Sequence, residues 1–103
     1  MSETHYLHFR IKQVFTSKTI EQKWVSTMSM NTFVLNMKQI GALMLEIPAE
    51  HVEIVECGQE MANCRAEDAP ALTENMYPFN YTLFDKYGSN FTSFYVRISL
   101  PTL

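Results

Sequence analysis

The feature that most constrains this chain is a change in the spacing of its apolar residues. In Tyr6–Lys12 the side chains alternate, with three large apolar residues on one side of an extended ribbon, and Thr19–Val25 alternates in the same way. Alternation with a period of two is typical of a strand that buries one face. The polar residues 16–18 between these segments predict the turn of an antiparallel hairpin.

Between Phe33 and Leu45 the apolar residues recur at a helical spacing instead. At about 100° per residue, most of them fill a single arc of a helix. The residues of this arc are Phe33, Val34, Met37, Ile40, Gly41, Met44 and Leu45. We expect Asn31 or Thr32 to cap the start of the helix, because a short side-chain oxygen can accept the unpaired amides of the first turn. Pro48 is expected to end it, since the residue before a proline is pushed out of helical geometry.

The rest of the chain predicts further strands and one irregular segment. His51–Glu56 alternates like a strand, Cys57–Met61 predicts a turn and a short strand, and Ser93–Leu100 predicts the last strand. Residues 62–71 predict a loop, and the aromatic-rich segment 72–91 has no clear period. A hairpin covered by one helix and joined by later strands predicts a two-layer α+β domain.

Composition narrows the class of protein. The chain has 103 residues, 47% of them hydrophobic and 18% charged, which suits one folded domain. A net charge of −3 excludes the broad basic surface of a nucleic-acid-binding protein. Because no apolar run approaches the ~18 residues of a membrane helix, we expect no membrane partner. The first five residues do not resemble a signal peptide, so we expect an intracellular protein, cytoplasmic or nuclear, with Cys57 and Cys64 reduced.

Several local sequences resemble ubiquitin. The triplet Lys18-Thr19-Ile20 is identical to the one that opens the second strand of ubiquitin. From about residue 33 to 61 the helix register, the Ile47-Pro48 pair and the pattern Ile54-Val55-x-x-Gly58-Gln59-x-Met61 align with ubiquitin without a gap. Phe94-Tyr95-Val96-Arg97-Ile98 resembles its last strand. The resemblance covers about two-thirds of the chain.

This resemblance implies a fold and a class of function. It implies one ubiquitin-like β-grasp domain over residues 1–103, an α+β fold with a mixed sheet packed on one helix and an aromatic-rich segment inserted before the last strand. Conjugated members of the family end in Gly-Gly, whereas this sequence ends Leu100-Pro101-Thr102-Leu103, so the implied type is non-conjugated. Such a domain would be a protein-protein interaction module in a ubiquitin-pathway or scaffold assembly, without a cofactor.

One candidate partner surface follows from the resemblance, because β-grasp domains usually present a patch on the sheet. The matching positions and their neighbours are His8, Arg10, Val55, Gly58, Tyr95 and Arg97. Tyrosine and arginine are also enriched at binding hot spots. The alternative is a solvated sheet face that binds nothing.

A second candidate is the outer flank of the predicted helix. Leu35 and Leu43 project from its otherwise polar side, about two helical turns apart. They would form a ridge that docks in the manner of a helix in a groove. The alternative is that the inserted segment 72–91 folds back and covers both leucines.

Catalysis and metal binding have little support. Cys57 and His51 lack a recognisable third group to orient them, as a nucleophilic pair requires. Cys57 and Cys64 lack the close pairing of structural zinc ligands. We therefore expect no enzyme activity and no metal site.

Self-assembly is the alternative to binding a different protein. β-grasp relatives also dimerise or polymerise by matching acidic and basic faces. The residues that would supply the two signs here are Lys12, Lys18, Lys23, Glu46, Glu50, Glu53 and Glu56.

Overall fold

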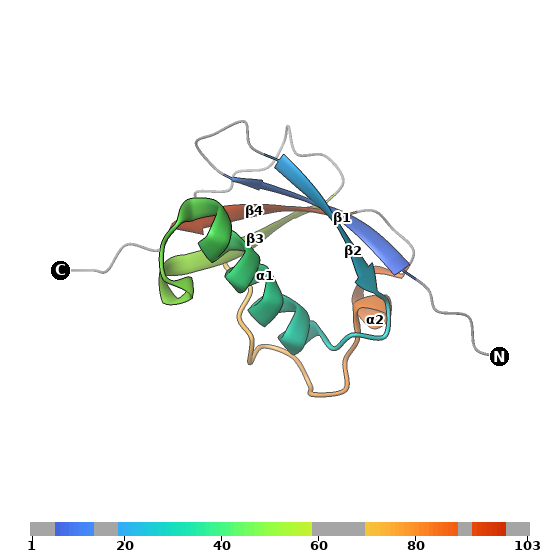
Figure 1. The fold of residues 1–103 in the computed structure, drawn as a ribbon. Coiled ribbons are helices and arrows are strands. Elements are labelled where there is room, and N and C mark those ends of the chain that lie inside the picture. Colours follow the sequence, from blue (N-terminus) through green and yellow to red (C-terminus); the bar gives the residue numbers. More distant parts are fainter. Residues whose placement is uncertain (1–5, 14–18, 59–69, 89–91, 99–103) are drawn as a thin grey trace.

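The computed structural model describes residues 6–13, 19–58, 70–88 and 92–98. The elements in chain order are β1 (Tyr6–Gln13), β2 (Thr19–Val25), α1 (Met30–Leu45), the 3-10 turn η1 (Ala49–His51), β3 (Val52–Gly58), α2 (Leu83–Tyr87) and β4 (Thr92–Ile98). Figure 1 shows α1 crossing one face of the sheet, with the segment that precedes α2 passing beside the N-terminal end of α1.

The sheet has four described strands in the order β2-β1-β4-β3 and is mixed. β1 pairs antiparallel with β2 and parallel with β4, and β3 pairs antiparallel with β4. Ile11 lies opposite Ile20 on one side and Phe94 on the other, so apolar side chains gather on one face. Helix and sheet together form the α+β β-grasp architecture that the sequence predicts.

Aromatic rings fill the space between α1 and the sheet. Phe9, Phe33 and Phe94 pack edge to face, with ring centroids 5.3 to 5.6 Å apart. Trp24 lies 4.9 Å from Phe33, and Tyr87 of α2 lies 5.2 Å from Phe9. These edge-to-face pairs add to the stabilisation that burial supplies. The predicted apolar arc of α1 is confirmed as the face that meets this core, because its central residues are buried.

Gly41 sets how closely α1 approaches the strands. A Cβ atom at this position would lie 2.8 Å from Cγ1 of Val52 and 2.8 Å from Cγ1 of Val96. The C-terminal half of α1 therefore rests directly on β3 and β4, where a larger residue would clash. Leu43 follows two positions later, about 200° around the helix, and so points away from the sheet.

The ends of α1 differ from the sequence prediction. The N-cap is Ser29, whose side chain accepts a hydrogen bond from the Thr32 amide at 3.2 Å, and not Asn31 or Thr32. The side chain of Asn31 instead bonds a distant part of the chain. The helix ends at Glu46, which adopts the left-handed conformation with φ 58°, before Pro48 is reached. Pro48 precedes η1.

The remaining boundaries follow the prediction with small shifts. β3 begins at Val52 because His51 belongs to η1, and it continues through a register shift between Glu56 and Gly58. The turn predicted from Cys57 does not begin there, because Cys57 and Gly58 belong to β3. The predicted short strand and the loop up to residue 69 lie outside the described residues, as do the turn at 16–18 and the end of the last strand. In the aromatic-rich segment, Leu72 bridges to Ile54 of β3. A capping box of Thr82 and Asp85 then starts α2.

Candidate interaction surfaces

The sheet patch that the sequence suggests is less open than expected. Val55 lies on the face away from α1, in register with Tyr95, but it is fully buried. Strand alternation assigns Val55 to this face but does not show whether the face is open, and in the structure its side chain is not accessible to solvent. Tyr95 is partly buried, and the Arg97 Nε donates to Oε1 of Glu53 at 3.1 Å. Gly58 lies in β3 beside the register shift.

The outer face of α1 is exposed and carries almost no charge. Its exposed residues recur every three or four positions. They are Thr32, Leu35, Gln39, Leu43 and Glu46. Between Met30 and Leu45 the only charged residue is Lys38, whereas solvent-facing helices normally carry several charges. Leu35 is 45% exposed and Leu43 is 80% exposed.

The segment before α2 is fastened to the N-terminal half of α1. Asn31 Nδ2 donates to the carbonyl of Tyr77 at 2.8 Å, and the Tyr77 amide donates back to Asn31 Oδ1 at 3.1 Å. The Met30 amide donates to the carbonyl of Tyr81 at 2.7 Å. Lys38 Nζ lies 2.8 Å from Glu74 Oε2, and this hydrogen bond lowers the pKa of Glu74.

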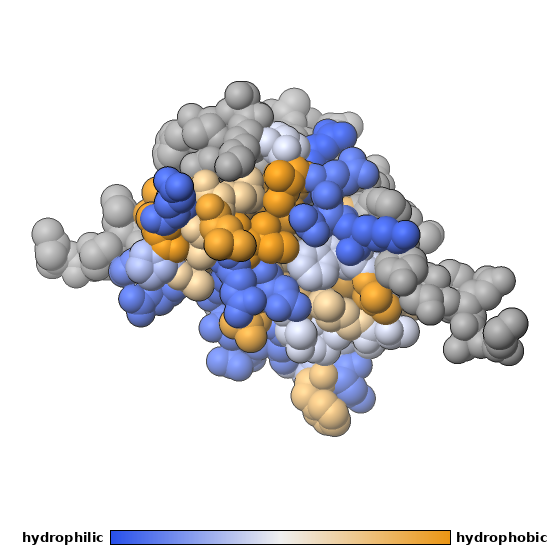
Figure 2. All heavy atoms as spheres, viewed as in Figure 1, coloured by the Kyte–Doolittle hydropathy of each residue, from blue (hydrophilic) through white to orange (hydrophobic). Residues whose placement is uncertain are grey.

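The segment before α2 does not cover Leu43, and it leaves Leu35 about half exposed. The segment packs along residues 26–38, and Leu43 lies beyond its last bond to the helix, at Lys38. Figure 2 shows hydrophobic surface gathered over the C-terminal half of α1, next to hydrophilic surface. Of the predicted helix flank, Leu43 is thus the more open position.

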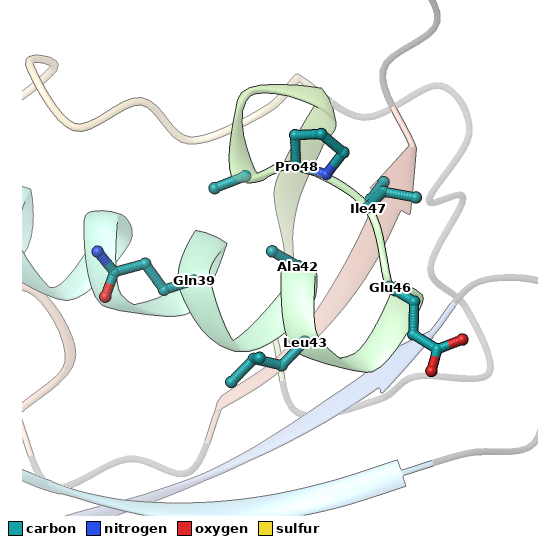
Figure 3. A pocket seen from close by; sticks show the side chains of 7 residues that line it. Gln39, Ala42, Leu43, Glu46, Ile47 and Pro48 are labelled. Carbon is teal, nitrogen blue, oxygen red and sulfur yellow. The ribbon is translucent and has the colours of Figure 1, made fainter.

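A groove of about 710 Å³ lies beside Leu43. It forms where the chain turns back at the end of α1 and enters η1. Figure 3 shows Ala42 between Leu43 and Pro48, with Gln39 and Glu46 toward opposite ends. The lining is completed by Ile47 and Ala49, so most of it is apolar.

The charges near the groove are acidic. Glu46 lines it, and Glu50 follows the lining residue Ala49, with a side chain that is 78% exposed and 3.7 Å from His51 Nε2. Two other carboxylates of the predicted acidic face have partners within the domain. Glu53 pairs with Arg97, and Glu56 lies 3.6 Å from Lys86 Nζ.

The aromatic-rich segment attaches α2 to β3 through a cluster around Lys86. Its Nζ lies over the rings of Tyr77 and Tyr87, 5.7 and 5.5 Å from their centroids, and the Tyr87 hydroxyl donates to Glu56 at 3.2 Å. Burial raises the pKa of Tyr87 far above its usual range, with the Glu56 charge acting in the same direction. Tyr77, Tyr87 and Lys86 therefore have structural roles, since they hold α2 against β3.

Cys57 corrects one expectation. It is disulfide-bonded, although the composition predicts reduced thiols. A pair of cysteines is too few for a scaffold but is enough for one bond, so the count alone does not predict the redox state. Cys64, the other cysteine of the chain, lies outside the described residues.

The described part of the chain contains neither a candidate metal site nor a candidate membrane-spanning helix. Residues 6–13, 19–58, 70–88 and 92–98 contain no group of three His, Cys, Asp or Glu side chains that could hold a metal ion. Among the same residues, no helix has both the length and the apolar character needed to cross a bilayer.

Comparison with known proteins rests on structure. No protein-family model and no curated protein sequence matches the chain. The C-terminal ubiquitin-like domain of mouse tubulin-specific chaperone e superposes with a TM-score of 0.61 at 16% identity, over 100% of this chain and 96% of that domain. Caldiarchaeum subterraneum ubiquitin gives a TM-score of 0.57 at 11% identity, with coverages of 96% and 98%.

A third similar structure is a chain of a pParkin-pUb-UbcH7 complex. It has 18% identity and a TM-score of 0.53, and the match covers 91% of this chain but 23% of that one. This chain has a mixed sheet and one main helix, and the structures that superpose on it are ubiquitin or ubiquitin-like domains. This chain therefore has the ubiquitin-like β-grasp fold.

Proposed function

We propose that this chain is a protein-protein interaction module of the ubiquitin-like type, which docks a partner in a ubiquitin-pathway or scaffold assembly through the outer face of α1. The observation that carries the proposal is Leu43, a large apolar side chain that is 80% exposed and borders an apolar groove. Leu35 extends the same ridge toward the N-terminus of the helix. A ridge of this kind suits docking against an apolar groove or helix on a partner.

The alternative surface on the sheet supports docking less well. Val55 is buried, and the Arg97 guanidinium is occupied by Glu53. Tyr95 and Arg97 would have to contribute from a partly buried position, and a partner would have to compete with the Glu53 pair. The structural neighbours are consistent with an interaction role, since one of them belongs to a complex with ubiquitin.

The test compares the proteins captured from a cell extract by the wild-type chain and by three variants. Leu35→Ser/Leu43→Ser removes the helix ridge, and Arg97→Glu alters the sheet patch. Phe79→Ser is the matched control, because Phe79 is 86% exposed and lies in the segment before α2. We expect the helix variant alone to lose captured proteins. An unchanged set with the helix variant would contradict the proposal.

Self-assembly is tested by measuring the mass of the chain in solution over a range of concentrations and salt. Of the four carboxylates in the predicted acidic face, Glu53 and Glu56 pair within the domain. Glu46 and Glu50 are left to contact a second copy. We therefore expect a monomer at high protein concentration and low salt. A dimer that the Leu35→Ser/Leu43→Ser variant disrupts would replace the proposed partner with a second copy of the chain.

A further inference from the structure

We propose that the groove beside Leu43 binds a basic segment of the partner, a short stretch in which one large aliphatic or aromatic side chain is flanked by Lys or Arg. This proposal rests on the proposed function and specifies the chemistry of the partner. It is carried by the shape and apolar lining of the groove and by the sign of the charges that surround it.

The groove provides a place for one apolar anchor. Ala42 is small, so the surface between Leu43 and Pro48 is hollow, and Ile47 and Ala49 continue the apolar lining (Figure 3). The volume of about 710 Å³ accommodates a large side chain together with neighbouring atoms of the segment that carries it. Filling the groove would remove apolar surface from water on both proteins.

The charge around the groove selects a cation. The C-terminal end of a helix carries a partial negative charge from its unpaired carbonyl groups. Glu46 adds a full negative charge at this end of α1, and Glu50 adds a second carboxylate in η1, which lies 3.7 Å from His51 Nε2 but is largely exposed. No basic residue lies in the last turn of α1, and the sequence from Gln39 to Glu50 contains neither Lys nor Arg.

The conformation of Glu46 gives independent support. It is the one non-glycine residue with a positive φ in the described part of the chain. A glycine would adopt this conformation without strain, and a lysine would complement the helix dipole. Glutamate does neither, so two local preferences are set aside at one exposed position. Residues that break local rules in this way are expected at functional sites.

The experiment is a selection from a library of random 12-residue peptides displayed on phage. The full 103-residue chain is the target, and binders that also bind the Leu43→Ser variant are removed. We expect the surviving peptides to share one Leu, Ile, Met or Phe with Lys or Arg within about four residues on either side, the span of one helical turn. A surviving set with neutral or acidic flanks, or no surviving set, would overturn the proposal.

Matched variants then separate the apolar anchor from the charge. The best peptide is synthesised, and its affinity is measured for the wild-type chain and for Glu46→Gln/Glu50→Gln, with Glu21→Gln as the control on the far face of the sheet. We expect the double variant to weaken binding about 5- to 20-fold at low salt and less at high salt, as expected for exposed charge pairs. Equal affinity for the double variant and the wild type would also overturn it.

The outcomes distinguish this proposal from the one on which it rests. Leu43-dependent peptides without basic flanks would leave the docking surface intact and reject only the basic partner. Both the docking surface on α1 and the basic partner would be rejected by two results together: the Leu35→Ser/Leu43→Ser variant captures the same proteins as the wild type, and the selected peptides bind another face. Amide shifts in a titration of the labelled chain identify the face, and we expect them in residues 39–50.

Discussion

The two halves of α1 lie on the same sheet but have different surroundings. The N-terminal half is covered by the segment before α2, which is bonded through Asn31 and Lys38. The C-terminal half rests on β3 and β4 through Gly41 and leaves Leu43 open to solvent. The difference shows that one helix can supply both a structural seam and an unoccupied surface, with the division falling between Lys38 and Leu43.

Among the variants that test this division, Asn31→Leu is expected to change the free energy of unfolding most. The substitution removes both hydrogen bonds to the Tyr77 backbone and leaves a partly buried carbonyl and amide without partners. Each such loss costs about 1 to 3 kcal/mol for a fully buried group. Since these two groups are only partly buried, we expect the lower end of that range for each, a fall of about 2 to 3 kcal/mol in the free energy of unfolding. Urea denaturation measures the loss. Gln39→Leu, on the open half, is the control and should change stability by less than about 0.5 kcal/mol.

Gly41→Ala tests the contact beneath the open half. The new methyl group meets Val52 and Val96 at 2.8 Å, and overpacking of this kind costs about 1 to 3 kcal/mol. The better helix propensity of alanine returns about 1 kcal/mol, so we expect the free energy of unfolding, measured by heat or urea, to fall by up to about 2 kcal/mol. Combining it with Val96→Ala should cost less than the sum of the two single variants. An additive result would show that the helix moves away freely.

The Lys38–Glu74 pair gives the covered half a small pH dependence. Because the pKa of Glu74 is lowered in the fold, its carboxylate stabilises the fold above the unfolded pKa of about 4.5. This contribution is lost as the pH falls through the folded pKa. Because the pair is partly exposed, we expect less than about 1 kcal/mol. Comparing unfolding of the wild type and Lys38→Met at pH 6 and pH 3 measures it. The gap between them should narrow at the lower pH.

The smallest expected effect is that of Leu43→Ser. Since Leu43 is 80% exposed, the free energy of unfolding should change by no more than about 0.5 kcal/mol. Leu35→Ser should cost more, because Leu35 is only half exposed at the covered end. Parallel denaturation curves check both variants. If Leu43→Ser destabilised the domain as much as Leu35→Ser, the two halves of α1 would not differ in how far they are covered.

The strands and the helix stripe could be predicted because their signals are local. Alternation located β1, β2 and β4, and the helical spacing located the buried residues of α1. The prediction that the sheet is mixed came from the resemblance to ubiquitin. The cap at Ser29 was missed because Asn31 and Thr32 are equally good capping residues in isolation. Only the position of Tyr77, 46 residues away, shows that Asn31 is used elsewhere.

The candidate site was harder to predict than the fold. The sequence indicated Leu43 as an apolar residue on a polar flank, but the groove depends on the turn at Glu46 that brings Pro48 beside Ala42. No glycine signals that left-handed turn. The burial of Val55 could not be predicted either, because whether its face of the sheet is open depends on long-range packing that the spacing of residues does not encode.

The place of β4 in the sheet has a consequence for synthesis of the protein. β4 pairs with both β1 and β3, so it joins two parts of the sheet that are not otherwise adjacent. A nascent chain that has not yet released residues 92–98 from the ribosome holds Phe9, Phe33 and Ile54 without the strand that buries them. Until those residues emerge and pair, the apolar side chains that β4 covers stay open to solvent and to other chains.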